Sequence, residues 1–415
     1  MSRLGQRLLA TIVELWVVAI ATTSALAGAL PDSTWVALTP LPNQPRAALF
    51  ALAVDPSNSQ VVLAGDSLGS IHRSITGGVS WSTVYGSRSA ITAMSFNPYT
   101  KGLALAGTRG AGALISRDGG ATWSATRGLE GRIVRVFAFA LTLVAAGTDH
   151  GVYVSVDGLT WRQSGLTDLS VNALAVEAIH EPVRLVAGSD AQLSAGGLPL
   201  LQTLDDGVTW KPFIPAISGT IAVKLATGPL PPTGNIRPLV VGTNTGLFAS
   251  KDNGATFVPL SGGGLLPTTD YTQVNFIANH HDRYYVASDG GGSGAGGLWR
   301  TDSAGQAFTS LRPPEASVSA LAVSNDEKPV LYVATFRPAT HMANLWAYHD
   351  TGGTPQGPPV TATPAVSGTR QASPGEPSLV DQLIGSAQLP YIGLGLGALA
   401  VVLTAVAAHL RGRYR

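Results

Sequence analysis

Aspartates recur in this chain at one fixed place of an eight-residue motif, [ST]-x-D-x-G-x-[ST]-[WF]. Three copies keep every position, namely SRDGGATW at 116–123, TLDDGVTW at 203–210 and SKDNGATF at 250–257. Recurring carboxylates could act as calcium ligands or as the acids of a glycoside hydrolase. The motif appears once per structural repeat, however, so its aspartates are spread around the molecule and cannot converge on one site. The motif is therefore interpreted as a turn between two strands.

The residue types of the motif suit a tight reversal of the chain. Glycine adopts positive φ without steric cost, and Asp, Ser and Thr side chains hydrogen-bond the backbone of a turn. The aromatic residue packs on the neighbouring strand, and the N–H of a Trp needs an acceptor there. The residues assigned to this structural role are Ser116, Asp118, Gly120, Trp123, Asp157, Trp161, Asp205, Gly207, Trp210, Asp252, Gly254 and Phe257.

The other reactive side chains form no recognisable site in the sequence. The chain has no cysteine, which excludes thiol catalysis, disulfides and Cys-ligated zinc. Its eight histidines form no H-x-x-x-H or H-x-H pair, and DGGGSGAGG at 289–297 lacks the Lys-Ser/Thr and the helix of a phosphate-binding loop. A formal charge of +1 gives no basic footprint for nucleic acid. The sequence therefore predicts no metal, no other cofactor and no nucleic-acid partner.

A repeated pattern of strands positions these motifs. The aromatic residues of complete and eroded copies follow one another at intervals of 38–51 residues, a period typical of repeat architectures. Each unit holds an apolar strand such as ALFALAVDP, a second strand that ends in small residues, a third that enters the motif, and a fourth that begins at the aromatic residue. Four short strands per unit predict a β-propeller blade. The first strands start near Ala47, Ala90, Ile133, Ser170, Thr220, Tyr271 and Ser317.

The seventh unit has no fourth strand of its own, because Pro355 ends its motif. Ahead of the first unit lies STWVALTP, in which Trp35 precedes Trp81 by one period. We expect this N-terminal segment to complete the last blade, which closes the ring and leaves no exposed strand edge. The sequence thus predicts an all-β, seven-bladed propeller over residues 34–355.

The motif resembles the Asp-box, or bacterial neuraminidase repeat, of sialidases, the sortilin family and the photosystem II assembly-factor propellers. The resemblance covers roughly residues 34–355 and implies a propeller, whereas function has to be argued from a site. Sialidases carry an Arg triad, a Tyr–Glu pair, a catalytic Asp and an F/Y-R-I-P stretch. This chain lacks that stretch, and its nearest early arginine is Arg46. A sialidase-like glycoside hydrolase is therefore the alternative, and a non-catalytic binding module is favoured.

The two ends of the chain are apolar. In the segment 1–30, arginines precede an apolar run that begins at Leu8, and Ala25 and Ala27 form an A-x-A cleavage pattern. This layout predicts a secretory signal peptide, with an uncleaved signal anchor as the alternative. Either form places the following residues outside the cytoplasm.

The C-terminal end predicts a membrane anchor. Residues 356–388 are rich in Pro, Gly, Ser and Thr, which indicates an extended stalk. Residues 389–410 form an apolar stretch long enough to cross the hydrocarbon core as a helix in contact with lipid. The basic residues in 411–415 place that end in the cytoplasm, so the propeller is expected on the extracytoplasmic side of the cytoplasmic membrane.

Polar residues at the starts of inner strands are the candidate ligand-facing positions. Ligands of propellers usually dock around the central channel, and four inner strands open with a polar residue in an otherwise apolar run: Thr92, Arg135, Asn172 and Ser319. The alternative is that these residues only solvate the strand ends. The predicted function is binding of a protein or a cell-surface glycan, and the resemblance to photosystem assembly factors implies a role in assembly or stability of a membrane complex.

Overall fold

The fold was analysed in a computed structural model of the chain. The described residues are 30–42, 47–179, 182–190, 198, 200–213, 217, 219, 221–232, 236–267, 269–278, 280–291, 295–337, 340 and 342–362. The predicted signal segment, the stalk beyond residue 362, the membrane helix and the basic tail lie outside them. In the part of the chain that is described, no helix combines the length and the hydrophobicity needed to cross a membrane.

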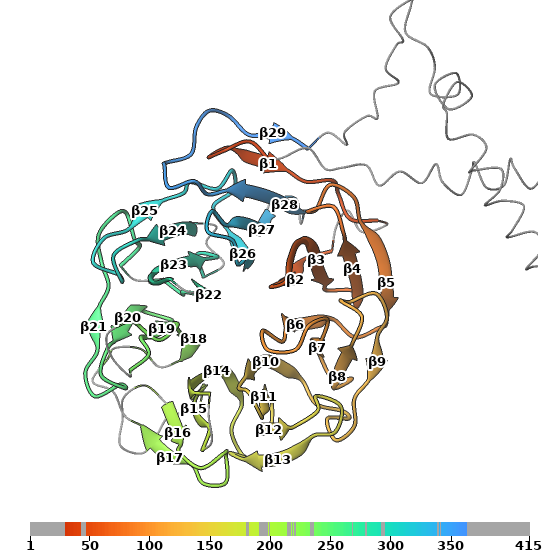
Figure 1. Cartoon of the computed structure of the whole chain (residues 1–415), viewed down its shortest axis with the longest axis vertical. Coiled ribbons are helices and arrows are strands. Elements are labelled where there is room, and N and C mark those ends of the chain that lie inside the picture. Colours follow the sequence, from red (N-terminus) through yellow and green to blue (C-terminus); the bar gives the residue numbers. More distant parts are fainter. Residues whose placement is uncertain are drawn as a thin grey trace, which may run out of the picture. The chain divides into compact units, whose positions relative to one another are not determined.

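Seven sheets stand around a ring, each with one strand at the centre and another at the rim, and all their strand pairs are antiparallel except the outermost pair of the seventh sheet (Figure 1). The first three sheets consist of β2 (Leu49–Asp55), β3 (Asn58–Asp66), β4 (Ser70–Ser74), β5 (Ser82–Gly86); β6 (Ile91–Phe96), β7 (Ala104–Thr108), β8 (Ala113–Ser116), β9 (Ser124–Ala125); and β10 (Val134–Phe139), β11 (Val144–Thr148), β12 (Gly151–Ser155), β13 (Arg162–Gly165). The next three consist of β14 (Val171–Ala178), β15 (Arg184–Ser189), β16 (Leu200–Thr203), β17 (Lys211–Phe213); β18 (Ala222–Thr227), β19 (Leu239–Thr243), β20 (Gly246–Ser250), β21 (Val258–Pro259); and β22 (Gln273–Ile277), β23 (His280–Ser288), β24 (Gly297–Thr301), β25 (Thr309–Ser310). The seven-bladed propeller is confirmed, and each inner strand begins one or two residues after its predicted start.

The seventh sheet joins both ends of the propeller. Its strands are β26 (Val318–Val323), β27 (Val330–Arg337), β28 (Met342–His349), β1 (Trp35–Ala37) and β29 (Val360–Thr361). β1 pairs antiparallel with β28, with Trp35 opposite Tyr348 and Ala37 opposite Trp346, as the predicted closure requires. In Figure 1 the red β1 lies between the blue β28 and β29.

The sequence did not predict a fifth strand. β29 runs parallel to β1 on its outer side, with Val36 opposite Val360, and the Ala362 N–H donates to the Ala37 carbonyl at 2.8 Å. These residues belong to the segment 356–388 that the sequence assigns to the stalk. The chain therefore leaves the propeller at its rim, after β29 has covered the edge of β1.

The apolar core is divided among the seven junctions between blades. Each of the seven buried clusters takes its residues from two adjacent sheets. One of them packs Val36 of β1 and Tyr332 of β27 against Leu52 of β2, so it seals the last blade onto the first. The ring is thus held by a closed set of apolar interfaces, with no blade left at an open end.

Small residues in the second strand of each blade allow the next blade to approach. Gly188 lies in β15, and a Cβ added there would stand 2.5 Å from the Cβ of Ala222 in the next inner strand. A Cβ at Gly242 would stand 2.3 Å from the carbonyl oxygen of Tyr271. Real carbon contacts do not become this short, so these positions admit only glycine. The small residues at the end of the second strand of each unit are therefore explained by close packing between adjacent blades.

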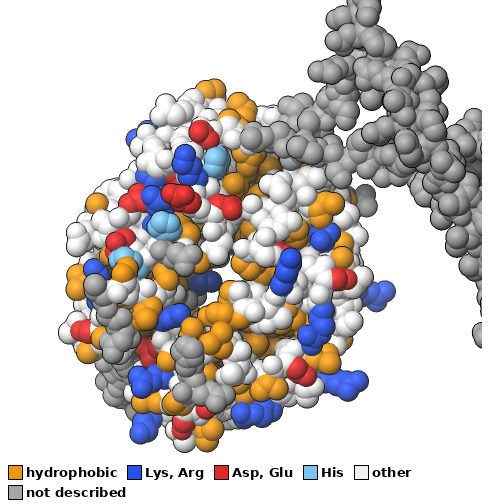
Figure 2. Space-filling view, viewed as in Figure 1, with side chains coloured by type: hydrophobic (Ala, Val, Ile, Leu, Met, Phe, Trp, Pro, Cys, Tyr) orange, Lys and Arg blue, Asp and Glu red, His pale blue; other side chains and the backbone are white. Residues whose placement is uncertain are grey.

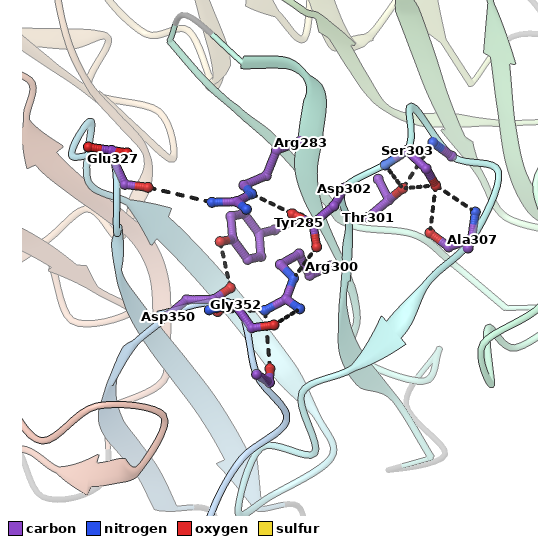
Figure 3. Close-up of polar contacts among 12 residues, drawn as sticks. Arg283, Tyr285, Arg300, Thr301, Asp302, Ser303, Ala307, Glu327, Asp350 and Gly352 are labelled. Carbon is purple, nitrogen blue, oxygen red and sulfur yellow. Dashed lines mark hydrogen bonds and ion pairs between the residues drawn. The ribbon is translucent and has the colours of Figure 1, made fainter.

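A buried ion pair fastens the sixth blade to the seventh (Figure 3). Arg300 of β24 is 3% exposed and donates to Asp350 at 2.5 Å, to the Gly352 carbonyl at 2.8 Å and to Asp302 at 2.7 Å. The hydroxyl of Tyr285 donates to the other Asp350 oxygen at 2.7 Å. Burial by itself would lower the pKa of Arg300, but the hydrogen bond and charge of Asp350 outweigh it and raise that pKa. Asp350 therefore bridges two blades.

Candidate binding site

The motif residues lie in the turns between the third and fourth strands. The Ser116 hydroxyl donates to Asp118 at 2.8 Å and accepts from the Gly120 N–H at 2.9 Å. Asp118 also accepts from the N–H and the hydroxyl of Thr122, at 2.9 and 2.6 Å. Corresponding Ser or Thr to Asp bonds form at Asp157, Asp205 and Asp252. All four aspartates act within their own turn.

The aromatic residues of the motif differ in the acceptor that they use. The indole N–H groups of Trp123 and Trp161 donate to the glycine carbonyl of their own turns, both at 3.1 Å. The indole N–H of Trp210 instead donates to the Ser164 carbonyl of the preceding blade at 3.0 Å. Phe257 has no N–H to satisfy and packs against the cluster between the fourth and fifth blades. The same motif position thus serves either the turn or the blade junction.

The hydrogen bonds that Asp205 accepts in its turn make the stability of the fold depend on pH. The Thr209 hydroxyl and backbone N–H, both donating to Asp205, lower the pKa of that carboxyl from 3.8 to about 2. A folded pKa below the unfolded value means that ionised Asp205 stabilises the fold above about pH 4, and that this contribution is lost as the pH falls toward about 2. We expect Asp205→Asn to flatten the pH dependence of the melting temperature in that window. Asp190→Asn, at an exposed position outside the turns, is the control and should keep the wild-type slope; equal slopes for both variants would contradict the prediction.

A β-bulge interrupts the pairing of the inner strands at one equivalent position. In six blades the inner strand has one extra residue, so that two of its residues lie opposite one residue of the second strand. In the first blade, for example, the register shifts between Leu49 and Ala51. A bulge re-aims the side chain of the extra residue. The extra residues in chain order are Phe50, Thr92, Arg135, Asn172, Val223 and Ser319. They form a ring of positions at one end of the channel, which we call the mouth.

The four predicted ligand-facing residues all occupy these bulges, with different surroundings. Arg135 is exposed, and Arg135, Thr92 and Asn172 line the hollow at the mouth. The Thr92 hydroxyl donates to the Val134 carbonyl at 2.5 Å, and the Ser319 hydroxyl donates to the Ala334 carbonyl at 3.3 Å. Thr92 and Ser319 therefore hold neighbouring backbone, whereas Arg135 keeps its guanidinium available.

The channel contains two neighbouring hollows. One, of about 330 Å³, is lined by residues of all seven inner strands; the other, of about 420 Å³, extends toward the opposite end of those strands. They share wall residues, among them Phe137, Lys224 and Asn275. Figure 2 shows the opening at the centre of the ring and apolar side chains on its wall, with charged side chains gathered over the sixth and seventh blades.

The charged side chains among the described residues that line the channel are all basic. Arg135 lines the hollow at the mouth, Arg237 lines the second hollow, and Lys224 of β18 lines both. Burial lowers the pKa of Lys224. At the mouth, the guanidinium of Arg109 lies over the ring of Phe50, 5.8 Å from its centroid. The channel therefore presents a positive interior that favours an anionic group.

Sequence inspection missed Lys224, although a signal was present. Lys224 follows the bulged residue directly, and the equivalent residues of the five other bulged blades are apolar: Ala51, Ala93, Val136, Ala173 and Ala320. Superimposing the inner-strand sequences at their bulges would have shown a lysine in an apolar column. The register of the bulge, which is a three-dimensional property, was needed to align them.

A second arrangement of polar residues resembles a hydrolytic triad. In the first blade Asp66 and His72, both fully buried, lie 3.1 Å apart, and the hydroxyl of Thr83 is 3.1 Å from the other ring nitrogen. The second Asp66 oxygen accepts from the N–H groups of Leu68 and Ser70, at 2.9 and 2.8 Å. Thr108 closes the equivalent turn of the second blade with its hydroxyl. Asp66 thus serves the turn between β3 and β4, and the set belongs to the framework.

No protein-family model matches the sequence, and no curated protein matches it. Solved structures do match in fold. A structure of YCF48 bound to a D1 peptide matches with 16% identity and a TM-score of 0.53, covering 79% of this chain and 98% of that one. The WD40 repeats of RRP9 match with 16% identity and a TM-score of 0.56, over 76% of this chain and 98% of the other.

An enzyme with the same fold is also similar. The GH74 xyloglucanase of Xanthomonas campestris matches with 13% identity and a TM-score of 0.54, covering 77% of this chain. This chain spans 56% of the length of that enzyme. Propellers with and without catalytic activity are therefore both similar to this chain, and the likeness shows the fold alone.

Proposed function

We propose that this chain is a non-catalytic binding module that captures a protein partner at the mouth of its channel. The observation that carries the proposal is the ring of bulged residues, five of which line one opening from five separate blades. A bulge beside a cavity re-aims side chains for recognition. The ring offers an aromatic residue, Phe50, and an exposed guanidinium, Arg135, the side-chain types that dominate protein interfaces.

The proposal also includes tethering to the cytoplasmic membrane on its extracytoplasmic side, and a role in assembly or stability of a membrane complex. Tethering is supported by the apolar segments 1–30 and 389–410 and by the arginines that flank them. The assembly role is supported by the fold shared with YCF48, a propeller seen bound to a D1 peptide. A propeller held near the membrane would meet the exposed segments of membrane proteins.

Photo-crosslinking in native membranes tests the proposal. A benzophenone amino acid replaces Phe50 at the mouth or, as the control, Val156, which is 83% exposed in the turn after β12 at the other end of the strands. We expect a discrete protein adduct from position 50 only, lowered about tenfold by Arg135→Glu because an interface arginine is typically a dominant contact. Arg162→Glu, an exposed arginine of β13, should leave the adduct unchanged.

Two outcomes would overturn the proposed protein partner. The first is equal crosslinking from positions 50 and 156, which indicates nonspecific contact. The second is the absence of a protein adduct together with Arg135-dependent binding of the full-length chain to a glycan array, which assigns the mouth to a glycan.

A glycoside hydrolase is the second candidate, because the structure places two carboxylates near each other beside the mouth. Burial, and then the charge of Asp289, raise the pKa of Asp270. Asp270 precedes β22 and Asp289 follows β23, at the end of the sheet where the bulges lie. A carboxyl with a raised pKa beside a second carboxylate is the pairing that glycosidases use. Turnover of fluorogenic sialosides or xyloglucan fragments that Asp270→Asn abolishes would establish this function in place of binding.

A further inference from the structure

We infer that the interior of the channel holds a carboxylate group, with Lys224 as its counter-ion. The inference rests on the proposed use of the channel for binding, and it names the chemical group that enters deepest. Lys224 lines both hollows, so it lies along the channel wall, between the mouth and the opposite end of the inner strands.

Lys224 has no polar partner among the described residues. No hydrogen bond or ion pair within the described ranges involves its ammonium, and the other charged residues on the described channel wall, Arg135 and Arg237, are also cations. A partly buried cation without a counter-charge is unfavourable, because the ammonium loses solvation by water and gains no interaction with an anion in exchange. An anion in the channel supplies that counter-charge.

The next inner strand provides further groups that lack a partner. Thr272 and Asn275, at the start of β22 and within it, line the same hollow as Lys224. The hydroxyl of Thr272 and the side-chain amide nitrogen of Asn275 are inaccessible to solvent and have no hydrogen-bond partner among the described residues. Since buried polar groups are normally paired, these two atoms are hydrogen-bonding groups still free beside the hollow, and a small turn of either side chain toward it would let the group bond an anion there.

These groups suit a carboxylate better than a phosphate. A carboxylate carries one charge and has two oxygens, which matches a single ammonium beside an amide and a hydroxyl. A phosphate carries close to two charges and three acceptor oxygens, and would leave part of its charge uncompensated at this point of the channel. The carboxylate has two possible sources, a free organic acid or the C-terminal end of a peptide.

Binding of an anion should also change the protonation of Lys224. Burial lowers the pKa of its amine in the free protein, and a neighbouring carboxylate reverses that effect. At a pH near or above the pKa of the free amine, the carboxylate is therefore expected to bind together with a proton. The proton-linked binding should weaken as the pH rises, because less of the amine is then protonated.

The chain is well suited to a direct test, because it has five lysines and the other four, Lys101, Lys211, Lys251 and Lys328, are exposed. Full-length protein in mild detergent is labelled with [ε-13C]lysine, and the Lys224 signal is assigned by Lys224→Arg. The probes are acetate, tetra-alanine with a free carboxylate, tetra-alanine amide and inorganic phosphate, all at constant ionic strength. We expect the Lys224 signal to move toward its low-pH position with a carboxylate probe and to stay in place with the amide.

The pattern of responses identifies the source of the carboxylate. A response to acetate alone supports a free acid, and a response to tetra-alanine but not its amide supports a peptide end. Lys224→Met should abolish ligand-linked proton uptake, whereas Lys251→Met, at an exposed position in a turn, should retain it.

Three results would overturn the inference: no movement of the Lys224 signal with any probe, movement with phosphate alone, or an equal movement of all five lysine signals. These measurements use wild-type protein, so they remain informative if Lys224→Met does not fold. They are also separate from the crosslinking test, which can fail for want of a protein partner while acetate still shifts the Lys224 signal.

Discussion

Replacement of Arg300 by methionine is expected to lower the free energy of unfolding by about 3–5 kcal/mol. The variant leaves the carboxylate of Asp350, which is 1% exposed, buried without its counter-charge, and such unpaired buried charges are among the most destabilising single changes. It also removes the donors to the Gly352 and Gly353 carbonyls that attach the end of the seventh blade. Chemical and thermal unfolding of the purified chain measure the loss.

Arg283 provides the matched control. It pairs with the same Asp302 that Arg300 contacts, but its side chain and that of Asp302 are 25% and 41% exposed (Figure 3). Such solvent-accessible pairs are worth about 0–1 kcal/mol, so Arg283→Met should change stability little. Arg300→Met combined with Asp350→Asn removes both charges and should recover part of the loss. Equal effects of Arg283→Met and Arg300→Met would show that burial of the pair is unimportant.

The blades could be predicted because their determinants are local in sequence. The turn that contains Asp118 is closed by bonds between residues at most four positions apart, so its motif is legible without a structure. Short apolar runs mark the strands, and the repeat period counts the blades. The place of β1 followed from the count of strands, because the seventh unit lacked a fourth strand and the N-terminal segment belonged to no other unit.

Features that depend on distant residues were missed. β29 lies in a Pro- and Gly-rich segment, and Val360 pairs only because the edge of β1 is available to it. Asp350 belongs to an eroded copy of the motif, yet its partners Arg300 and Tyr285 come from the blade before it. Local sequence describes the turn at Asp350 but cannot identify a contact made across a blade junction.

The candidate site was predicted at its mouth and not in its interior. Arg135 and Asn172 stand out because a polar residue opens an apolar strand. Lys224 has the same local appearance, but its importance depends on which face of the strand meets the channel. A bulge shifts the residues beyond it to the opposite face of the strand. The order of residues in the sequence therefore no longer shows which side chains face the channel.

Deletion of the indole of Trp35 is the second large effect that we expect. Trp35 is 4% exposed, its indole N–H donates to the Leu311 carbonyl of the sixth blade at 2.8 Å, and its ring centroid lies 4.9 Å from that of Tyr348. The β1 strand has three residues, so this side chain is one of the few that attach it to the ring. Trp35→Ala should lower the free energy of unfolding by about 3–5 kcal/mol, the range for large-to-small changes of aromatic residues in cores.

Two further variants separate packing from strand pairing. Trp35→Phe keeps an aromatic ring and loses the bond to Leu311, so it should lower the free energy of unfolding by about 1 kcal/mol. Val360→Ala, at a 44% exposed position of β29, should have little effect. Because release of β1 uncovers the edge of β28, Trp35→Ala should also form oligomers in size-exclusion chromatography, as unpaired edges do. The prediction would be contradicted if Trp35→Ala stayed monomeric and were as stable as Val360→Ala. The ring would then close without β1, and the shape of the channel would not depend on the N-terminal strand.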